Sequence, residues 1–464
     1  MATEGLVASL EQLVWLLWEF ACNKPLQFLL TFVLPLAGLA VLCVGAHAVR
    51  LLEPGTNWLT LLPQIYIVLH LVAPKPRLPF PSEKTYLTTH SDGTVSAPRP
   101  LPCWYDRWHA EGCLRQEYPT IPAGFPVPDE ATIEPAEVEV TVVVPAYNEE
   151  ARITAALEEM VEYLDQQFGR PTNNQLLQPE RQERSAQKQN KRGKRATTPH
   201  RLVFKPDSPT AATHGATLPE TTPSGYEILI IDDGSRDRTV EVALAFSRRH
   251  ALHDILRVVK LQKNRGKGGA VTHGLRHARG RYAVFADADG ASRFSDLGRL
   301  IEGCEDVVDG SHRGVAIGSR AHLVGSEAVV QRSAVRNFLM RSFHFVLTIL
   351  TPPATSRIRD TQCGFKLFSR AALPHVVPYM HAEGWIFDIE MLMLAESAPA
   401  TPVLASDGSV IGTSSGIRVA EVPVGWHEVD GSKMNLVQDS VRMAIGLAVL
   451  RASWMLGVYR RRLT

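Results

Sequence analysis

Two aspartates separated by a single residue, Asp287 and Asp289, are the residues of this chain best suited to hold a metal ion. Carboxylate oxygens are hard ligands, and two of them side by side suit Mg²⁺ or Mn²⁺ that bridges a diphosphate. The pattern Asp-x-Asp also occurs by chance in many proteins. It therefore carries weight only together with other signals.

Three further polar clusters precede this pair, with the sequences PAYNEE at 145–150, DDGSRDRT at 232–239 and KNRGKGGA at 263–270. Carboxylates can accept hydrogen bonds from ribose hydroxyls or a uracil N–H, and a flat tyrosine ring can pack against a base. The glycines after Arg265 let backbone amides approach a phosphate, to which Arg265 and Lys267 add positive charge. Each cluster alone is an ordinary turn or helix cap. The occurrence of all four clusters in this order along the chain is hard to explain by turn-forming residues alone.

Each cluster follows an apolar, strand-like run. These runs are residues 138–144, 227–231, 258–261 and 282–286. Helical patterns lie between them, and alternating buried strands and helices indicate a parallel, doubly wound α/β sheet. Such sheets bind their ligands at the carboxyl ends of the strands. The four polar clusters are therefore expected to meet at one edge of the sheet.

The first 74 residues are expected to form a membrane anchor. Residues 28–46 are about 19 residues without a charge, enough to span a hydrocarbon core. A cleaved signal peptide is a weaker alternative, because the apolar stretch is too long and begins too far from Met1. A second apolar segment at 58–73 can be a second span, an interfacial segment or a packed helix. Lysines and arginines after the span place the C-terminal part in the cytosol.

The remaining segments divide the chain further. Residues 75–136 are proline-rich and are interpreted as an irregular connector, and 137–436 as the catalytic domain. Within that domain, 170–225 is polar, lacks periodicity and is predicted to be a disordered insertion. Residues 337–350 and 437–464 are interpreted as amphipathic helices at a membrane surface.

The composition excludes few classes of protein, but the net charge and the cysteines are each informative. The chain has 464 residues, a net charge of +1 and six cysteines without metal-ligand spacing. The balanced charge gives no indication of a nucleic-acid partner. The scattered cysteines favour a reducing compartment for the main domain.

Taken together, the clusters resemble the large inverting glycosyltransferase family with the nucleotide-diphospho-sugar-binding (GT-A) fold. Later strings, among them NRGKGGAV at 264–271, GSRAHL at 318–323, RDTQCGFKLFSR at 359–370 and GWIFDIE at 384–390, are similar to the dolichyl-phosphate β-glucosyltransferases within it. The resemblance spans about residues 139–436. It implies a mixed sheet, UDP-glucose as donor, dolichyl phosphate as acceptor, inversion at the sugar, a divalent metal, and a place in N-glycan precursor assembly at the endoplasmic reticulum membrane.

The resemblance also implies roles for individual residues. It implies that Asp287 and Asp289 bind the metal. The residues that it implies for binding the nucleotide sugar are Pro145, Tyr147, Glu149, Asp232, Asp233, Arg265, Lys267, Asp287 and Ala288.

The acceptor is a phosphate monoester with a second pKa of about 6, so it is already largely dianionic at pH 7. No strong base is then required, and catalysis rests on orientation, on the metal and on cations that hold the lipid phosphate. The candidate cations are Arg320, Arg332, Arg359, Lys366 and Lys433. The acids expected to face the sugar are Asp360, Asp388 and Glu390, although Asp388 and Glu390 can equally be helix N-terminal charges. The strand-like segment 421–429 is expected to close one side of the acceptor site.

Two alternatives stay open at this point. One is a dolichyl-phosphate mannosyltransferase that uses GDP-mannose, and the other is a non-catalytic membrane scaffold that kept the fold. A processive polysaccharide synthase is disfavoured, because Gln331 is followed by RSAVRN and not by the Gln-x-x-Arg-Trp signature.

Overall fold

In a computed structural model of the chain, the residues described are 61–117, 133–171, 223–323, 346–404, 410–429 and 436–461. The predicted span at 28–46, nearly all of the predicted insertion at 170–225 and most of the predicted helix at 337–350 lie outside these ranges.

A seven-stranded sheet forms the centre of the catalytic domain, with the strand order β11-β7-β8-β6-β3-β4-β5. The strands are β3 Val138–Ala146, β4 Tyr226–Asp232, β5 Leu256–Lys260, β6 Gly280–Ala286, β7 Val315–Ser319, β8 Phe365–Ser369 and β11 Val419–Pro423. Strands β3 to β6 are the four that the apolar runs predict, and they are parallel. Because both sides of each strand are covered, their residues are apolar and β-branched without alternation.

The later strands confirm the mixed sheet that the resemblance implies, and they limit the parallel pattern to part of the sheet. Strand β8 enters between β6 and β7 and is antiparallel to both, whereas β11 is parallel to β7. The sheet is therefore mixed, as in a GT-A-like α/β fold. The reversal brings the start of β8 to the same edge as the ends of β6 and β7, since Phe365 lies opposite Ala286.

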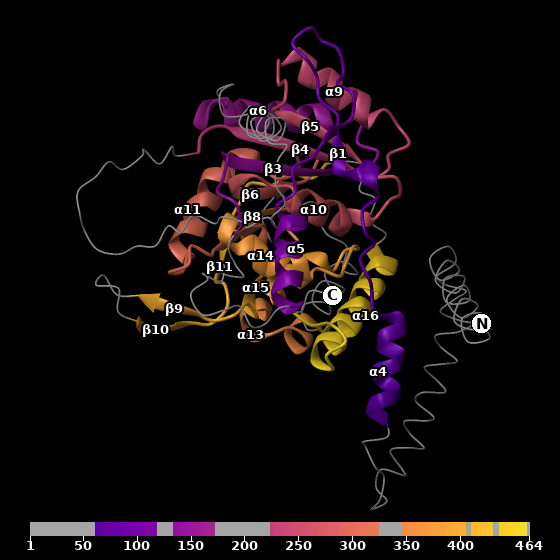
Figure 1. The fold of residues 1–464 in the computed structure, drawn as a ribbon, viewed down its shortest axis with the longest axis vertical. Coiled ribbons are helices and arrows are strands. Elements are labelled where there is room, and N and C mark those ends of the chain that lie inside the picture. The colour runs from indigo at the N-terminus through magenta and orange to yellow at the C-terminus, as the bar shows by residue number, and fades with distance from the viewer. Residues whose placement is uncertain are drawn as a thin grey trace, which may run out of the picture.

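Helices cover both faces of the sheet (Figure 1). One face carries α6 Ile153–Gln167, α9 Thr239–Arg249 and α11 Leu297–Val307; the other carries α10 Gly266–Arg276, α14 Leu373–Val376 and α15 Phe387–Glu396. Alternate residues of β3 point to opposite faces: Val142 packs in the first layer and Val143 in the second. Short elements complete the domain: α13 Pro353–Ser356 and the 3₁₀ helices η4 Phe294–Asp296, η5 Ala321–Leu323, η6 Arg370–Ala372 and η7 Val377–Tyr379.

A two-stranded hairpin projects from the body of the domain at the lower left of Figure 1. It consists of β9 Thr401–Leu404 and β10 Val410–Ser414. Arg313 is fully buried at its base and donates to the carbonyl of Pro399 and to the hydroxyl of Thr401.

The predicted connector is more ordered than its proline content suggests. It contains η3 Pro81–Lys84, β1 Thr85–Tyr86, β2 Arg99–Pro100 and a helix of 14 residues, α5 Trp104–Glu117. Leu87 forms a bridge with Val258 at the edge strand β5, and the Trp104 indole donates to the carbonyl of Leu275 in α10 at 2.8 Å. This part of the connector is thus packed onto the domain.

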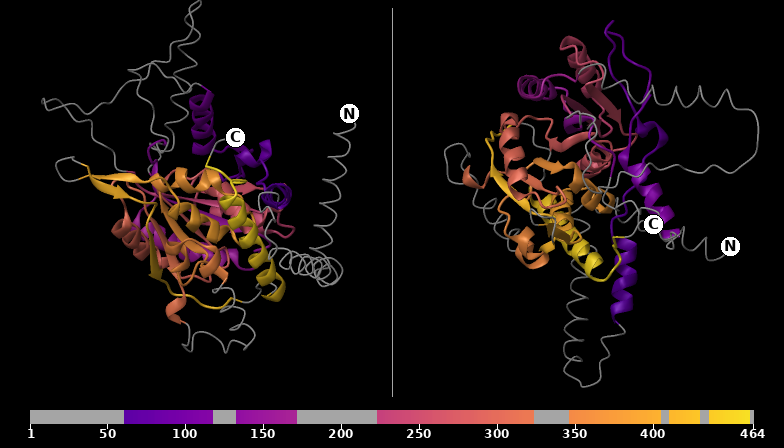
Figure 2. Two further views of the ribbon diagram at one scale, coloured as in Figure 1. Left: turned by 90° about the horizontal axis from the view of Figure 1, so that it is seen from below. Right: turned by 60° about the vertical axis from the view of Figure 1, so that its left-hand side comes forward.

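Two helices lie side by side at the lower right of the molecule (Figures 1 and 2). They are α4 Leu61–Val72, within the second apolar segment, and α16 Leu436–Met455, within the C-terminal segment. The Tyr459 hydroxyl after α16 donates to the carbonyl of Pro74 after α4 at 2.6 Å. Among the described residues, no helix is both long enough and apolar enough to cross a bilayer.

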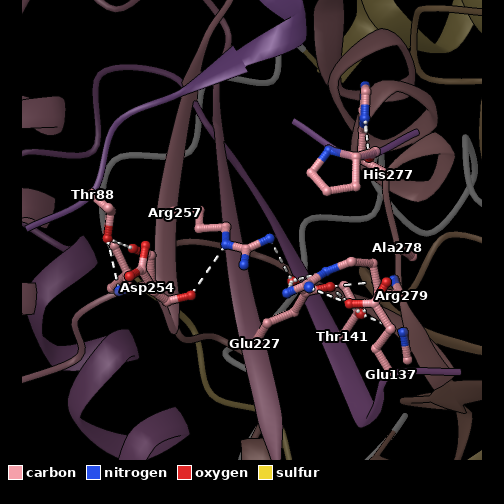
Figure 3. Close-up of polar contacts among 12 residues, drawn as sticks. Thr88, Glu137, Thr141, Glu227, Asp254, Arg257, His277, Ala278 and Arg279 are labelled. Carbon is pink, nitrogen blue, oxygen red and sulfur yellow. Dashed lines mark hydrogen bonds and ion pairs between the residues drawn. The ribbon is translucent and has the colours of Figure 1, made fainter. Parts of the chain in front are cut away.

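A buried ionic network lies near the amino ends of β4 and β6 (Figure 3). The carboxylate of Glu227 accepts from both Nε and Nη2 of Arg279 and from the hydroxyl of Thr141, and it lies 3.3 Å from Nη1 of Arg257. Burial alone would raise the pKa of Glu227, but the charges of Arg279 and Arg257 lower it to about 2. This network is remote from the carboxyl ends of the parallel strands, so it stabilises the fold and does not take part in the site.

Candidate active site

The acidic pair lies where β6 ends. Asp287 and Asp289 follow Ala286 directly, and their side chains are 28% and 29% exposed. The ammonium of Lys267, from α10, lies 2.6 Å from Oδ1 of Asp287. Burial alone would lower the pKa of Lys267, but the charges of Asp287 and Asp388 raise it. The structure therefore brings the predicted diphosphate lysine and the predicted metal ligands together.

Gly364, just before β8, makes room for the Asp287 carboxylate. A Cβ at this position would lie 1.9 Å from Oδ2 of Asp287. Two hard carboxylate ligands that are partly exposed fit a Mg²⁺ or Mn²⁺ ion whose other ligands are phosphate oxygens and water. Within the described ranges no group of three or more His, Cys, Asp or Glu side chains could hold a metal.

The loops after β3 and β4 are fastened to each other. Asn148, in a left-handed conformation with φ of 52°, donates its N–H to the Ser235 hydroxyl and accepts from the N–H of Arg236. The N–H of Glu149 donates to the Thr239 hydroxyl at 2.8 Å. The predicted nucleotide residues on these loops, half-buried Pro145 and Tyr147 and buried Glu149, Asp232 and Asp233, therefore share one rigid unit.

Arg152 is a site residue that the sequence analysis did not identify. Its Nε and Nη2 donate to the two carboxylate oxygens of Glu149, both at 2.8 Å, and its Nη1 lies 4.0 Å from Oδ2 of Asp289. A positive charge three residues after Glu149, at the start of a predicted helix, is the signal that could have revealed it, because such residues are neighbours on a helix.

Asp233 has a different partner from the predicted uridine. Its two carboxylate oxygens accept from the backbone N–H groups of Arg265 and Gly266, at 2.7 and 2.8 Å. Burial raises the pKa of Asp233 to about 7. A carboxylate therefore satisfies the first donors of α10 in this structure, and the approach of backbone amides to a phosphate at the glycines after Arg265 stays a prediction.

Arg265 also differs from its predicted role. Its side chain is only 2% exposed and forms an ion pair with Glu383, with Nε 2.9 Å from Oε1. The partly exposed carboxylate of Glu383 is thus the counter-ion of this buried guanidinium. Of the two predicted diphosphate cations, Lys267 is the one that lies beside the acidic pair.

A second ion pair joins two of the residues that were predicted for the acceptor side. The guanidinium of Arg320, after β7, donates through Nε and Nη2 to both oxygens of Asp360, at 2.7 and 2.8 Å. Burial alone would raise the pKa of Asp360, but the hydrogen bonds and charge of Arg320 lower it. Burial alone would lower the pKa of Arg320, but the hydrogen bonds and the charge of Asp360 raise it. Arg320 follows the end of β7, on the sheet edge where β6 ends at Ala286 and β8 begins at Phe365.

Glu421, inside β11, supports that ion pair. It accepts from the N–H groups of Arg359 and Asp360 and from the Ser319 hydroxyl. The first residues of the segment 421–429, which was predicted to close the acceptor site, belong to the edge strand β11, and they contribute this carboxylate. Further along the segment, the ring centroid of Trp426 lies 5.8 Å from the guanidinium carbon of Arg320. The sequence signal for this role of Glu421 was its position as a single acidic residue within an otherwise apolar strand.

Three predicted acceptor-side residues are occupied by structural contacts. Lys366 is fully buried, donates to the carbonyl of Cys363 at 2.6 Å and pairs with Asp388. Glu390 is also fully buried and accepts from the N–H groups of His381 and Ala382. In this structure Lys366 therefore cannot contact a lipid phosphate, and Glu390 does not face a sugar. Asp388 and Glu390 both lie in the first turn of α15, which is the position expected if they act as charges at a helix N-terminus.

The other predicted residues vary in location. Arg359 has an exposed side chain next to the Arg320–Asp360 pair, and Ala288 is buried between the two metal-site aspartates. Arg332 and Lys433 lie outside the described residues.

The sequence of this chain is similar to those of known glycosyltransferases. The sequence model of the family "Glycosyl transferase family 2" matches residues 215–373. The dolichyl-phosphate β-glucosyltransferase of Saccharomyces cerevisiae is 33% identical over 85% of this chain and 91% of its own length. The chain belongs to the dolichyl-phosphate β-glucosyltransferase family.

A second relative, the dolichyl-phosphate β-glucosyltransferase of Dictyostelium discoideum, is 39% identical over 51% of this chain and 65% of its own length. Among solved structures, a glucosyl-3-phosphoglycerate synthase of Mycobacterium tuberculosis is 15% identical over 68% of this chain and 80% of its own, with a TM-score of 0.37, too low to bear on the site. As a member of the dolichyl-phosphate β-glucosyltransferases, the chain is a glycosyltransferase, which confirms the resemblance found in the sequence.

Proposed function

We propose that this protein transfers glucose from UDP-glucose to dolichyl phosphate and releases UDP, with inversion at the sugar and with a divalent metal. The observation that carries the proposal, beyond the family, is that an acidic pair with a lysine and the Arg320–Asp360 pair lie at one edge of the sheet, after the ends of β6 and β7. The first group suits a nucleotide diphosphate, and the second adjoins the place where an acceptor phosphate must enter.

On the donor side, Asp287 and Asp289 would hold Mg²⁺ or Mn²⁺, which stabilises the negative charge that develops on the departing UDP. Lys267 adds a fixed positive charge there, because its Nζ already lies within 2.6 Å of Asp287. Arg152 orients Glu149 and keeps a positive charge within 4.0 Å of Asp289. Preorganised charges of this kind lower the barrier without reorganisation during the reaction.

On the acceptor side, an oxygen of the lipid phosphate attacks the anomeric carbon as the bond from that carbon to the diphosphate oxygen breaks. The α-linked donor thus gives a β-linked glucosyl phosphate. Because the phosphate is dianionic near pH 7, the step needs no general base. This agrees with Asp388 and Glu390 being held in structural contacts. Arg320 and Arg359, together with Arg332 and Lys433, are proposed to hold the phosphate.

The lipid chain is proposed to reach the site along α16. The Gln362 amide, in the loop after Asp360, contacts the sulfur of Met443 on α16 at 3.6 Å. Apolar side chains on the outer sides of α4 and α16 are exposed: Ile67 by 58%, Leu71 by 63%, Val441 by 45% and Ile445 by 54%. Exposed apolar side chains of this density favour contact with a bilayer surface.

We further propose a location at the endoplasmic reticulum membrane, with the catalytic domain in the cytosol, and a place in N-glycan precursor assembly. The exposed apolar side chains support contact with a membrane. The positive charges after the apolar stretch at 28–46 support the orientation.

The deciding experiment is an assay of the full chain in detergent with dolichyl phosphate, a divalent metal, and UDP-glucose or GDP-mannose in parallel. We expect a β-linked glucosyl lipid from UDP-glucose that is lost with EDTA. Product from GDP-mannose alone would overturn the donor, an α-linked product would overturn inversion, and no product from either would favour the scaffold alternative.

A further inference from the structure

Helix α10 carries Lys267 in its first turn, and the loop that leads into it from β5 is held by a residue of the connector far away in sequence. Glu83 belongs to η3, and its side chain is fully buried. One carboxylate oxygen accepts from the backbone N–H of Gln262, the residue that opens the loop, at 2.8 Å. The carbonyl oxygen of Glu83 lies 2.9 Å from Nε2 of His273, in the second half of α10. Glu83 therefore contacts the chain on both sides of Lys267.

The carboxylate of Glu83 is fixed by further donors. Arg77 donates from Nη1 and Nη2 at 3.0 and 2.7 Å, and the N–H of Phe80 donates at 2.8 Å. A carboxylate with this many charge-assisted and backbone donors cannot turn away from Gln262 without leaving one of them unsatisfied. Burial alone would raise the pKa of Glu83, but the hydrogen bonds from Arg77, Gln262 and Phe80 lower it, so the group stays charged.

Two other carboxylates hold the same loop from within the catalytic domain. Asp233 accepts from the amides of Arg265 and Gly266, and Glu383 pairs with the Arg265 side chain. Together with Glu83 they fix the main chain from Gln262 to Gly266 from different directions. A lysine that must meet a diphosphate within a fraction of an ångström depends on such support.

We propose that Glu83 is a positioning residue for the nucleotide diphosphate: by holding Gln262 and α10, it sets where Lys267 meets the donor. This inference depends on the proposed role of Lys267 in donor binding. The bland alternative is that Glu83 only fastens the connector to the domain. In that case its loss lowers stability and the amount of active protein, without a selective effect on the donor.

The test uses the full chain in detergent, as wild type, Glu83→Gln, Glu83→Asp, Gln262→Pro and the double variant Glu83→Gln with Gln262→Pro. Gln262→Pro removes the N–H that Glu83 accepts. The matched control is Glu111→Gln, which removes a connector ion pair with Arg107 (2.9 Å) that does not contact the loop. Steady-state KM for each substrate, kcat, the Tm and the affinity for UDP are measured for every protein.

The loss of a hydrogen bond to a charged group predicts a rise of roughly tenfold in the KM for UDP-glucose and in the Kd for UDP in Glu83→Gln. The KM for dolichyl phosphate should stay unchanged, Gln262→Pro should match, and the double variant should be no worse than either single one. Glu83→Asp should recover part of the loss, and Glu111→Gln should behave as wild type.

The inference is overturned if a folded Glu83→Gln protein binds UDP as tightly as wild type, or if both KM values change equally. If Glu83→Gln does not fold, Gln262→Pro decides by the same criteria. If the wild type turns over no UDP-glucose, the proposed function fails, and UDP affinity in the same variants still decides the role of Glu83.

Discussion

Replacing Gly364 with alanine should displace Asp287 and leave the fold intact. The new Cβ would lie 1.9 Å from Oδ2 of Asp287, and real Cβ contacts essentially never fall below 3.0 Å, so the carboxylate must retreat by at least 3.0 − 1.9 = 1.1 Å. The atom that moves is the end of a side chain that is 28% exposed, so it can yield without moving the backbone. Gly364 does not adopt a positive φ, so alanine adds no backbone strain.

A displacement of about 1 Å at a reacting centre can cost on the order of 10²-fold in rate, which is about 2.7 kcal/mol of transition-state stabilisation. We therefore expect kcat/KM for UDP-glucose to fall by about two orders of magnitude in Gly364→Ala, with a higher metal concentration needed for half-maximal activity.

The assay is glucosyl-lipid formation over a range of MnCl₂ concentrations, with the Tm of each protein measured in parallel. Gly412→Ala is the matched control, because a Cβ there meets nothing within 4 Å. Wild-type activity and metal dependence in a folded Gly364→Ala protein would refute the assignment of Asp287 to the metal.

Three further outcomes are expected. Asp289→Ala should abolish transfer while the protein stays folded and bound to liposomes; full activity with metal still required would mean that the metal lies elsewhere. Arg152→Met should lower kcat/KM by about tenfold, as expected when a charged hydrogen-bond partner is lost, and an unchanged value would limit Arg152 to a structural role. Glu227→Gln should lower the free energy of unfolding at pH 7 by about 3–5 kcal/mol, because Arg257 and Arg279 lose their buried counter-ion; activity per folded molecule should be unchanged. Since the pKa of Glu227 is about 2 in the folded protein against an ordinary 4.5, its stabilisation is complete above pH 4.5 and lost as the pH falls toward 2. The wild-type Tm should thus fall in that range, and a wild-type Tm with no steeper fall there than that of Glu227→Gln would contradict the assignment.

The first half of the sheet was predictable from sequence because its strands are buried on both faces. Each of β3 to β6 contains an apolar run that is followed by polar residues, so both the strands and the edge they share could be inferred. The second half gave no such pattern. Strand β8 contains Lys366 as its second residue, and its antiparallel entry between β6 and β7 depends on long-range pairing that no local period encodes.

In the candidate site, it was easier to predict which residues belong to the site than which residues contact one another. The acidic pair and Lys267 were identified and do lie together. The contacts of Asp233 with the start of α10 and of Lys366 with Asp388 were not foreseen, because each joins residues that are distant in sequence and that are equally plausible as ligand-binding groups. Burial decides between these uses, and burial of a charged residue cannot be inferred from its neighbours in the chain.

The insertion of β8 between β6 and β7 also has a consequence for biosynthesis. During translation, β3 to β6 can pair as soon as they leave the ribosome, but β7 is bonded only to β8 and β11, which are made later. A nascent chain that ends before Phe365 therefore exposes both the apolar edge of β6 and the whole of β7. Such a chain is a substrate for chaperones, and pausing of translation in this interval should favour aggregation, whereas pausing after Pro423 should not.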